Sequence, residues 1–342
     1  MAGRRFTTVD VFAREPYAGN QLAVVHDAAD LDDDTMLALT RETNYSEATF
    51  LEDATADDDR YPVRIFDPAE ELPFAGHPTI GTAAVIREFV RDDHPDELVL
   101  DLPVGDVPVW VETDADGVER YWMQQVAPEF REGLDRDAAA AVLGLDPADL
   151  HDAPIDVVST GLPTLVVPLR DRDGVERAST QPDAYDREIV DGLGGANVLA
   201  VAADTVDADA DLHARVFADW AGVPEDPATG SAAGCLAAYL ARYDDAARRI
   251  GLDVPEGGRA RDHAGERADD LERDDGRARD RGRDAVDLVV EQGLEMGRPS
   301  RLHLRASVRD DASDGDAEAD GDREIDVRVG GRVIPISEGH LL

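Results

Sequence analysis

The sequence predicts an α+β fold of two similar halves, each a curved, mostly antiparallel sheet around a central helix. Short β-type runs such as RFTTVDVF and EATFLED recur along the chain, and many of them alternate apolar with polar residues, which is typical of antiparallel, half-exposed sheets. Helical patterns are fewer and lie near residues 31–42, 77–91, 137–144, 184–193 and 229–242. Two of these, beginning near Pro78 and Pro227, are rich in alanine and therefore indicate buried helices.

An internal repeat supports the division into halves. Residues 64–86 read RIFDPAEELPFAGHPTIGTAAVI, and residues 215–236 read RVFADWAGVPEDPATGSAAGCL. Each segment runs from a strand through a loop into Pro-x-x-Gly-[Ser/Thr]-Ala-Ala at the head of a helix, which makes Gly81 the expected counterpart of Gly230. We expect a first half at residues 1–127 and a second at 128–342, with the last strand a candidate for return to the first half.

The charge balance restricts the class of partner. Acidic residues outnumber basic ones 76 to 34, every basic residue is Arg, and the formal net charge is −42. Such a charge repels itself in dilute buffer and is tolerated where high salt shortens the Debye length. We interpret the acids as a solvated surface suited to the salty cytoplasm of an extreme halophile. Nucleic acids and anionic membranes are disfavoured as partners because their charge has the same sign.

Cysteine content and hydropathy exclude further classes. The chain has one cysteine, so neither an intramolecular disulfide nor a cysteine zinc site can form. No apolar run approaches the roughly 20 residues that span a bilayer. Arg4 and Arg5 are followed by charged residues instead of an apolar signal segment, which favours a cytoplasmic location. Residues 256–284 and 309–323 are densely charged and are expected to be disordered, solvated insertions.

The two alanine-rich helices predict an anion site. Proline suits the first turn of a helix, and His77 and Asp226 stand directly before Pro78 and Pro227. Free N–H groups of two first turns that face one another would hold a small carboxylate-bearing molecule between two titratable side chains. The alternatives are structural: Asp226 is a suitable helix N-cap, and His77 can be a capping or packed histidine. The shared position in both repeats favours a functional role.

The motifs VDVFAREPYAGNQLAVV, NYSEATF, ELPFAGHPTIGTA, DPATGSAAG and EQGLEMGRPSRL occur in this order over essentially the whole chain outside the insertions. This ordered set resembles the phenazine-biosynthesis PhzF-like proteins, which are relatives of diaminopimelate epimerase. The resemblance implies a two-domain fold of the diaminopimelate-epimerase type, a homodimer, and activity without a metal or an organic cofactor. The epimerase relatives use a pair of cysteines as bases, and this chain lacks them.

The resemblance also implies roles for individual residues. The glutamate of NYSEATF, Glu47, would be the general acid/base, with His77 and Asp226 as further catalytic groups. The loop that carries Gly19 and Asn20 departs from the family pattern because Gln21 replaces a proline. The substrate-binding residues implied by the motifs are Gly19, Asn20, Ser46, Gly76, Gly230 and Ser231.

The expected function is a cofactor-independent isomerisation or epimerisation that shifts a proton on a small carboxylate-bearing metabolite. Burial of Glu47 would make it a usable base near neutral pH. One alternative is a catalytically silent small-molecule-binding protein on the same fold. A hydrolase is disfavoured because the sequence shows neither a His/acid metal cluster nor a nucleophile elbow. Phenazine precursors and amino acid derivatives both stay open as substrates.

Overall fold

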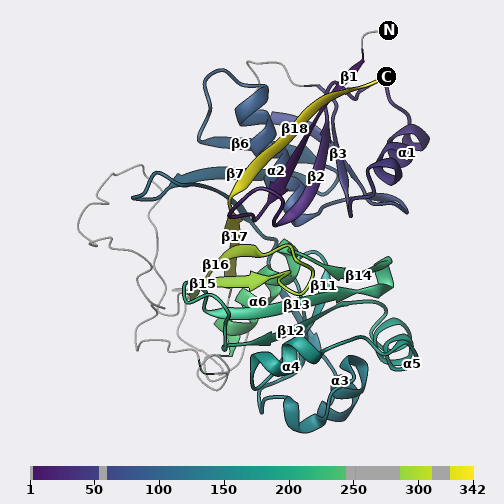
Figure 1. Ribbon diagram of the computed structural model, residues 1–342, viewed down its shortest axis with the longest axis vertical. Helices are drawn as coiled ribbons and strands as arrows, with labels where there is room; N and C mark the ends of the chain where they lie inside the picture. Colours follow the sequence, from purple (N-terminus) through teal and green to yellow (C-terminus); the bar gives the residue numbers. More distant parts are fainter. Residues whose placement is uncertain (1–2, 54–59, 244–250, 252–285, 310–323) are drawn as a thin grey trace, which may run out of the picture.

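The computed structural model describes residues 3–53, 60–243, 251, 286–309 and 324–342 (Figure 1). The insertions expected at 256–284 and 309–323 lie outside these residues, apart from Arg309 at the end of a strand. The elements of the first half are β1 (Arg4–Val11), β2 (Asn20–Val25), α1 (Asp33–Thr43), β3 (Ala48–Leu51), β4 (Arg60–Phe66), β5 (Glu71–Leu72), α2 (Gly76–Phe89), β6 (Glu97–Leu102), β7 (Gly105–Thr113) and β8 (Glu119–Gln124).

The second half contains the remaining elements. They are β9 (Glu129–Glu132), α3 (Arg136–Leu143), η1 (Pro147–Asp149), β10 (Asp156–Ser159), β11 (Pro163–Pro168), α4 (Arg172–Arg177), α5 (Pro182–Tyr185), η2 (Asp186–Gly192), β12 (Asn197–Ala202), β13 (Leu212–Ala218), η3 (Asp219–Ala221), β14 (Val223–Asp226), α6 (Gly230–Arg242), β15 (Val286–Gln292), β16 (Ser300–Arg309), β17 (Glu324–Gly331) and β18 (Val333–Leu341). Every helical region predicted from the sequence is helical. The short helix α4 was not predicted, because its six residues are too few to show a helical pattern.

The two halves share one strand topology. In the first half, β1–β2, β3–β4, β6–β7 and β7–β8 pair antiparallel, whereas β2–β3 and β4–β6 pair parallel. In the second half, β10–β11, β12–β13, β15–β16 and β16–β17 pair antiparallel, whereas β11–β12 and β13–β15 pair parallel. The succession of pairings is the same, which confirms the predicted α+β class with two related, mostly antiparallel halves.

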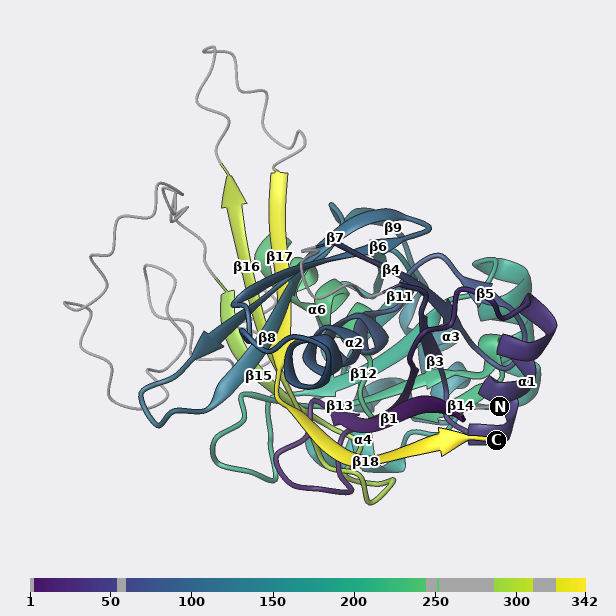
Figure 2. The ribbon, with the colours of Figure 1, turned by 90° about the horizontal axis from the view of Figure 1, so that it is seen from above.

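The halves exchange their last strands. The equivalent strands β8 and β17 pair antiparallel and form the seam between the two sheets. The chain then leaves β8 to place β9 beside β10 in the second sheet. In the same way it leaves β17 to place β18 beside β1 in the first sheet, where Arg4 stands opposite Leu341. The two ends of the chain therefore lie side by side, as Figures 1 and 2 show.

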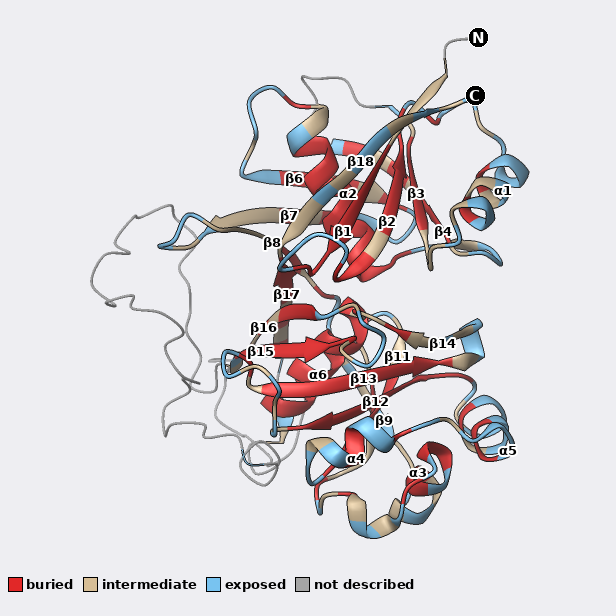
Figure 3. Ribbon diagram, in the orientation of Figure 1, coloured by how far each residue is buried: buried red, intermediate tan, exposed pale blue. Residues whose placement is uncertain are grey.

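A buried helix fills each sheet. Residues Gly76 to Arg87 of α2 and Gly230 to Ala241 of α6 are buried without interruption, and Figure 3 shows both helices red inside their strands. α2 packs against β1, β2, β8 and β18, and α6 packs against β10, β11, β15, β16 and β17. Small side chains let the strands approach on all sides, as the alanine-rich composition predicted.

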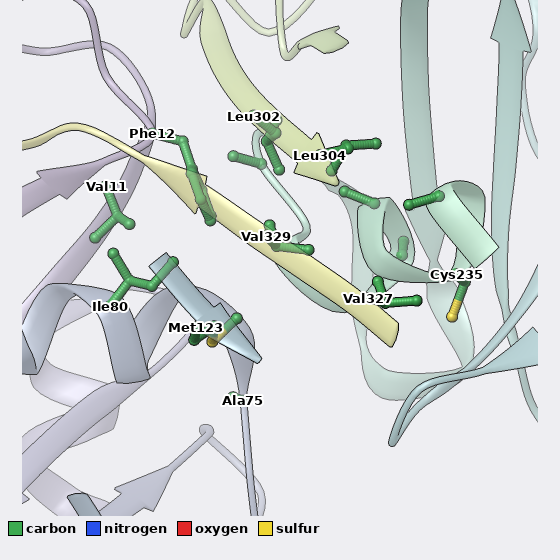
Figure 4. Packing of buried hydrophobic residues seen from close by; sticks show 14 of the residues in the cluster. Val11, Phe12, Ala75, Ile80, Met123, Cys235, Leu302, Leu304, Val327 and Val329 are labelled. Carbon is green, nitrogen blue, oxygen red and sulfur yellow. The ribbon is translucent and has the colours of Figure 1, made fainter. Parts of the chain in front are cut away.

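One apolar cluster crosses the seam and joins both halves. It includes Phe12, Ile80 and Met123 of the first half and Leu302 and Val329 of the second (Figure 4). Burial of this continuous cluster holds the two sheets in a fixed relation. The position of side chains at the boundary between the halves is therefore set by the same core that stabilises the fold.

Gly330 provides a test of the seam. It stands opposite Trp122 in the β8–β17 pairing, and a Cβ on Gly330 would lie 2.4 Å from Cδ2 of the buried Trp122 ring. We expect Gly330→Ala to lower the free energy of unfolding by about 2 kcal/mol, because overpacking a filled site forces the ring or the strand to move. Chemical denaturation would measure it. Gly174→Ala in α4 is the control: its Cβ would lie 3.6 Å from the closest atoms, so stability should not fall. Equal losses in both variants would contradict the account.

Candidate active site

The starts of α2 and α6 almost touch. A Cβ on Gly76 would lie 3.1 Å from the Ser231 backbone nitrogen and 3.2 Å from the Gly230 Cα. A Cβ on Gly230 would lie 3.5 Å from the Gly76 Cα and 3.3 Å from the Phe12 ring. Glycine at both helix starts therefore allows the two backbones to approach without an intervening side chain.

Neither helix start carries a side-chain cap from the described residues. The N-cap residues are Ala75 for α2 and Thr229 for α6, and neither side chain bonds to its own first turn. By contrast α1, α3 and α4 each begin with an aspartate that accepts a hydrogen bond from a first-turn N–H; these are Asp32, Asp135 and Asp171. Two uncapped, positively polarised helix ends thus face one another inside the molecule.

The register of the repeat differs from the sequence prediction. α2 begins at Gly76, so Gly81 lies within the helix, where a Cβ would meet the Leu22 and Val11 side chains. α6 begins at Gly230, and Pro227 precedes it in the loop after β14. Gly76, and not Gly81, is therefore the spatial counterpart of Gly230. The two Pro-x-x-Gly segments are similar in sequence but occupy different positions relative to their helix starts, because the loops before the two helices differ in length.

The same register decides the capping alternatives. Asp226 is the last residue of β14, and Thr229 occupies the N-cap position, so the interpretation of Asp226 as an N-cap is wrong. His77 lies inside the first turn of α2 and does not cap it either. Both side chains are buried and point into a shared polar cluster at the boundary between the halves.

The cluster joins residues from both halves. Glu47, just before β3, places Oε2 3.5 Å from Nε2 of His77. Asn20, at the start of β2, donates from Nδ2 to Asp226 Oδ1 at 2.8 Å and to the Ala228 carbonyl at 3.0 Å. The same Nδ2 lies 3.3 Å from His77 Nδ1. Asn20 thus links the titratable groups of the first half to Asp226 of the second.

Two atoms of the cluster have no hydrogen-bond partner among the described residues. They are Glu47 Oε2 and His77 Nε2, both buried. Their 3.5 Å separation is favourable when one proton lies between them, because two facing lone pairs would repel. A buried polar atom without a partner costs free energy and requires an explanation, and a catalytic or ligand-binding role is one.

Burial separates the protonation states of the three groups. It raises the pKa of Glu47 to about 7, assisted by Asp67 and opposed by a hydrogen bond with Ser46. Burial, together with the charge of Glu47, raises the pKa of Asp226 to about 6, while Thr229 and Asn20 oppose this by hydrogen bonding. Burial lowers the pKa of His77 to about 4, against the attraction of Asp226. Near pH 7 the histidine is therefore neutral, Asp226 is mostly ionised, and Glu47 is about half protonated.

The other residues expected to bind the substrate lie in two places, the helix contact and the polar cluster. Gly76, Gly230 and Ser231 form the contact between the helices. Ser46 Oγ lies 3.4 Å from Asn20 Oδ1, within the cluster. Asn20 uses its amide nitrogen for protein contacts, so its visible role is to organise the cluster. Three of these residues therefore belong to the helix contact and two to the polar cluster beside His77.

Gly19 has a backbone role. Its φ is +66°, and a Cβ would lie 2.3 Å from the Val11 carbonyl, so no other residue fits the turn before β2. Arg298 of the second half holds this turn: Nε donates to the Gly19 carbonyl at 2.8 Å, and an Nη donates to Asp10 at 2.7 Å. Sequence reasoning gave Arg298 no role, although it lies within the motif EQGLEMGRPSRL.

Among the described residues, no group of three or more His, Cys, Asp or Glu side chains is arranged to hold a metal ion. In that same part of the chain no helix is long and apolar enough to cross a membrane.

Comparison with known proteins identifies the family. The family model described as phenazine biosynthesis-like protein matches residues 9–268. The trans-2,3-dihydro-3-hydroxyanthranilate isomerase of Pseudomonas aeruginosa is 32% identical over 337 residues, which cover 98% of each chain. The chain belongs to the PhzF family. A trans-2,3-dihydro-3-hydroxyanthranilate isomerase from Pseudomonas fluorescens is 34% identical over 305 residues, which cover 89% of this chain and 91% of that one.

Solved structures agree with the family assignment. A PhzF family protein from Bacillus anthracis superposes with a TM-score of 0.77 at 24% identity and covers 100% of both chains. A predicted epimerase from Pseudomonas aeruginosa gives 0.70 at 32% identity over 99% of both. A hydroxyproline epimerase from Agrobacterium vitis, at 12% identity and 0.54, shares the fold over 100% of this chain and 91% of its own. This PhzF-family chain is an isomerase with the fold predicted from its motifs.

Glu47→Gln provides a test of the buried carboxyl. The folded pKa of about 7 lies above the ordinary 4.5, so the carboxyl favours folding below pH 4.5, and this contribution is lost as pH rises to about 7. The variant should therefore gain up to about 3 kcal/mol of unfolding free energy above pH 7, and nothing near pH 4.5. Denaturation at several pH values would measure the difference. The exposed Glu70→Gln should show no such trend, and a variant less stable than the parent at pH 8 would refute the account.

Proposed function

We propose that this PhzF-family isomerase shifts a proton on a small carboxylate-bearing metabolite without a cofactor, with Glu47 as the general acid/base. The observation that carries the proposal is the unpartnered, buried Oε2 of Glu47, 3.5 Å from His77 Nε2 and beside two uncapped helix starts. A carboxylate with a pKa of about 7 is matched to proton transfer near neutral pH.

The helix starts supply the anion site in this proposal. Their unbonded first-turn N–H groups and the Ser231 hydroxyl donate hydrogen bonds to the substrate carboxylate, and the dipoles of α2 and α6 add positive potential. When a substrate C–H bond next to a carboxyl group or a carbon–carbon double bond breaks, its proton passes to Glu47. The electron pair of that bond enters an enolate or dienolate. The same donors stabilise that negative charge as it develops.

The return of the proton completes the reaction. Protonated Glu47 delivers the proton to another carbon, which gives an allylic shift, or to the opposite face of the same carbon, which gives an epimer. Neutral His77 lies within reach of Glu47 and keeps the proton near the substrate. Ionised Asp226, linked to His77 through Asn20, keeps negative charge beside the imidazole. No electrons are gained or lost overall.

The names of the relatives indicate the first substrate class to test. Two of them are trans-2,3-dihydro-3-hydroxyanthranilate isomerases. A dihydroaromatic amino acid of this kind has both the carboxylate that the helix starts would bind and an acidic allylic C–H. Amino acids with an acidic α-proton are the second class.

Solvent exchange tests the role of Glu47. The wild-type protein, in molar KCl and D₂O, is incubated with trans-2,3-dihydro-3-hydroxyanthranilate and separately with a panel of amino acids, and proton NMR follows deuterium incorporation. Glu47→Gln should reduce the exchange rate at least about 100-fold, since it removes the base but keeps the side-chain size. Glu70→Gln serves as the control and should exchange at the parental rate. Parental exchange in Glu47→Gln would reject Glu47 as the base.

The same samples distinguish the proposed isomerase from the alternative, a catalytically silent binding protein. It would give no exchange with any compound in the wild-type protein, yet one or more carboxylates would raise the melting temperature. That result would support the anion site and contradict the proton transfer.

The pH dependence gives an independent check. The base form of Glu47 is required, so kcat/KM should fall as pH drops below about 7. Protonation of Asp226 adds a further loss below about pH 6, which makes the acid limb steeper than a single titration. Initial rates between pH 4.5 and 9 would show this limb. Rates that stay flat down to pH 5 would contradict the assignment of both carboxylates.

A further inference from the structure

Thr229 occupies the N-cap position of α6 but does not behave as a cap. A threonine there ordinarily accepts a hydrogen bond from an N–H of its own first turn. Here the hydroxyl instead donates to Oδ2 of Asp226. Its oxygen receives a hydrogen bond from Nε2 of Gln292 at 3.2 Å. The hydroxyl is thus turned away from the helix and toward the carboxylate.

Gln292 fixes the direction of these bonds. It is the last residue of β15 and is 1% exposed. Its Oε1 accepts from the Thr229 backbone N–H at 3.3 Å, which sets the orientation of the amide. Its Nε2 donates to the Asp226 carbonyl at 2.7 Å as well as to the Thr229 hydroxyl. Because an amide nitrogen only donates, the single hydrogen of Thr229 must point to Asp226.

Both oxygens of Asp226 therefore accept hydrogen bonds. Thr229 donates to Oδ2, and Asn20 donates to Oδ1. Protonation of the carboxyl on either oxygen would weaken these bonds because the neutral group is a poorer acceptor, so the arrangement favours the ionised form. The groups that face Asp226 from other elements are Glu47, whose charge favours protonation, and His77, which opposes it.

We propose that Thr229 and Gln292 are positioning residues that hold Asp226 as a fixed carboxylate beside His77 and leave the first-turn amides of α6 unbonded for the substrate. The assignment rests on the proposed function for its catalytic meaning. It implies that, near neutral pH, the proton taken from the substrate resides on Glu47 and not on Asp226. It also explains why a strong N-cap residue leaves its helix uncapped.

The test is designed to read Asp226 without turnover. The wild-type protein, Thr229→Val and Thr229→Ser are titrated by pH-difference infrared spectroscopy, and the Asp226 carboxyl band is assigned by its loss in Asp226→Asn. Thr229→Val keeps the shape of the side chain but removes the hydrogen-bond donor. As the pH is lowered, the band of the protonated Asp226 carboxyl should therefore appear about one pH unit higher than in the wild-type protein. Thr229→Ser keeps the hydroxyl and should titrate like the parent. A band at the parental pH in Thr229→Val overturns the proposal.

Activity then separates this proposal from the proposed function. With trans-2,3-dihydro-3-hydroxyanthranilate as substrate, Thr229→Val should lower kcat about tenfold or more, move the acid limb upward, and change KM little. Thr40→Val removes another buried hydroxyl, in α1, and controls for a loss of stability alone; its acid limb should not move. If the infrared band shifts while Glu47→Gln keeps full exchange, the positioning holds and the proposed function fails. If Glu47→Gln is inactive and the band does not shift, only the positioning fails.

Gln292→Leu provides a second variant in case Thr229→Val does not fold. It removes both donors to the Asp226 loop and frees the Thr229 hydroxyl to rotate toward its own helix. The infrared band should again move upward, and the acid limb with it. A parental band in a folded Gln292→Leu counts against the proposal as strongly as in Thr229→Val.

Discussion

The close approach of two helix N-termini at Gly76 and Gly230 is the constraint on which the rest of the structure depends. Each end carries a partial positive charge of roughly half an elementary charge, so two such ends repel in an apolar interior. The surrounding sheets, which pair at the β8–β17 seam, keep the two helix ends together. In the proposed function, an anion bound between the two ends would offset this repulsion.

The backbone is symmetric, but the chemistry is not. Gly19 and Gly161 both have positive φ and stand before the second strand of their half, yet one is followed by Asn20 and the other by Leu162. Asn20 organises the polar cluster on its side of the helix contact. On the other side, a Cβ on Gly161 would lie 3.5 Å from the Phe74 ring. The two halves therefore present different side chains at equivalent turns beside the helix contact.

Much of this architecture could be predicted from the sequence, because periodicity and an internal repeat report on local burial. The alanine-rich helices and the alternating strands follow from which faces are buried. The pairing of Gly76 with Gly230 could not be predicted, because similar segments begin at different points of their helices and only the three-dimensional contact separates them. Glu47, His77 and Asp226 were accessible through their motifs. Thr229 and Gln292 were not, because their roles lie in hydrogen bonds between residues 63 positions apart.

The exchange of last strands has a consequence for the order of events during synthesis. The first half cannot complete its sheet when residue 127 leaves the ribosome, because, among the described residues, the outer edge of β1 pairs with β18 at residues 333–341. Until then the nascent first half exposes an unpaired edge and part of the apolar cluster that crosses the seam. The first sheet is therefore complete only after residues 333–341 have been synthesised, and a chain without them leaves a strand edge open to pairing with other chains.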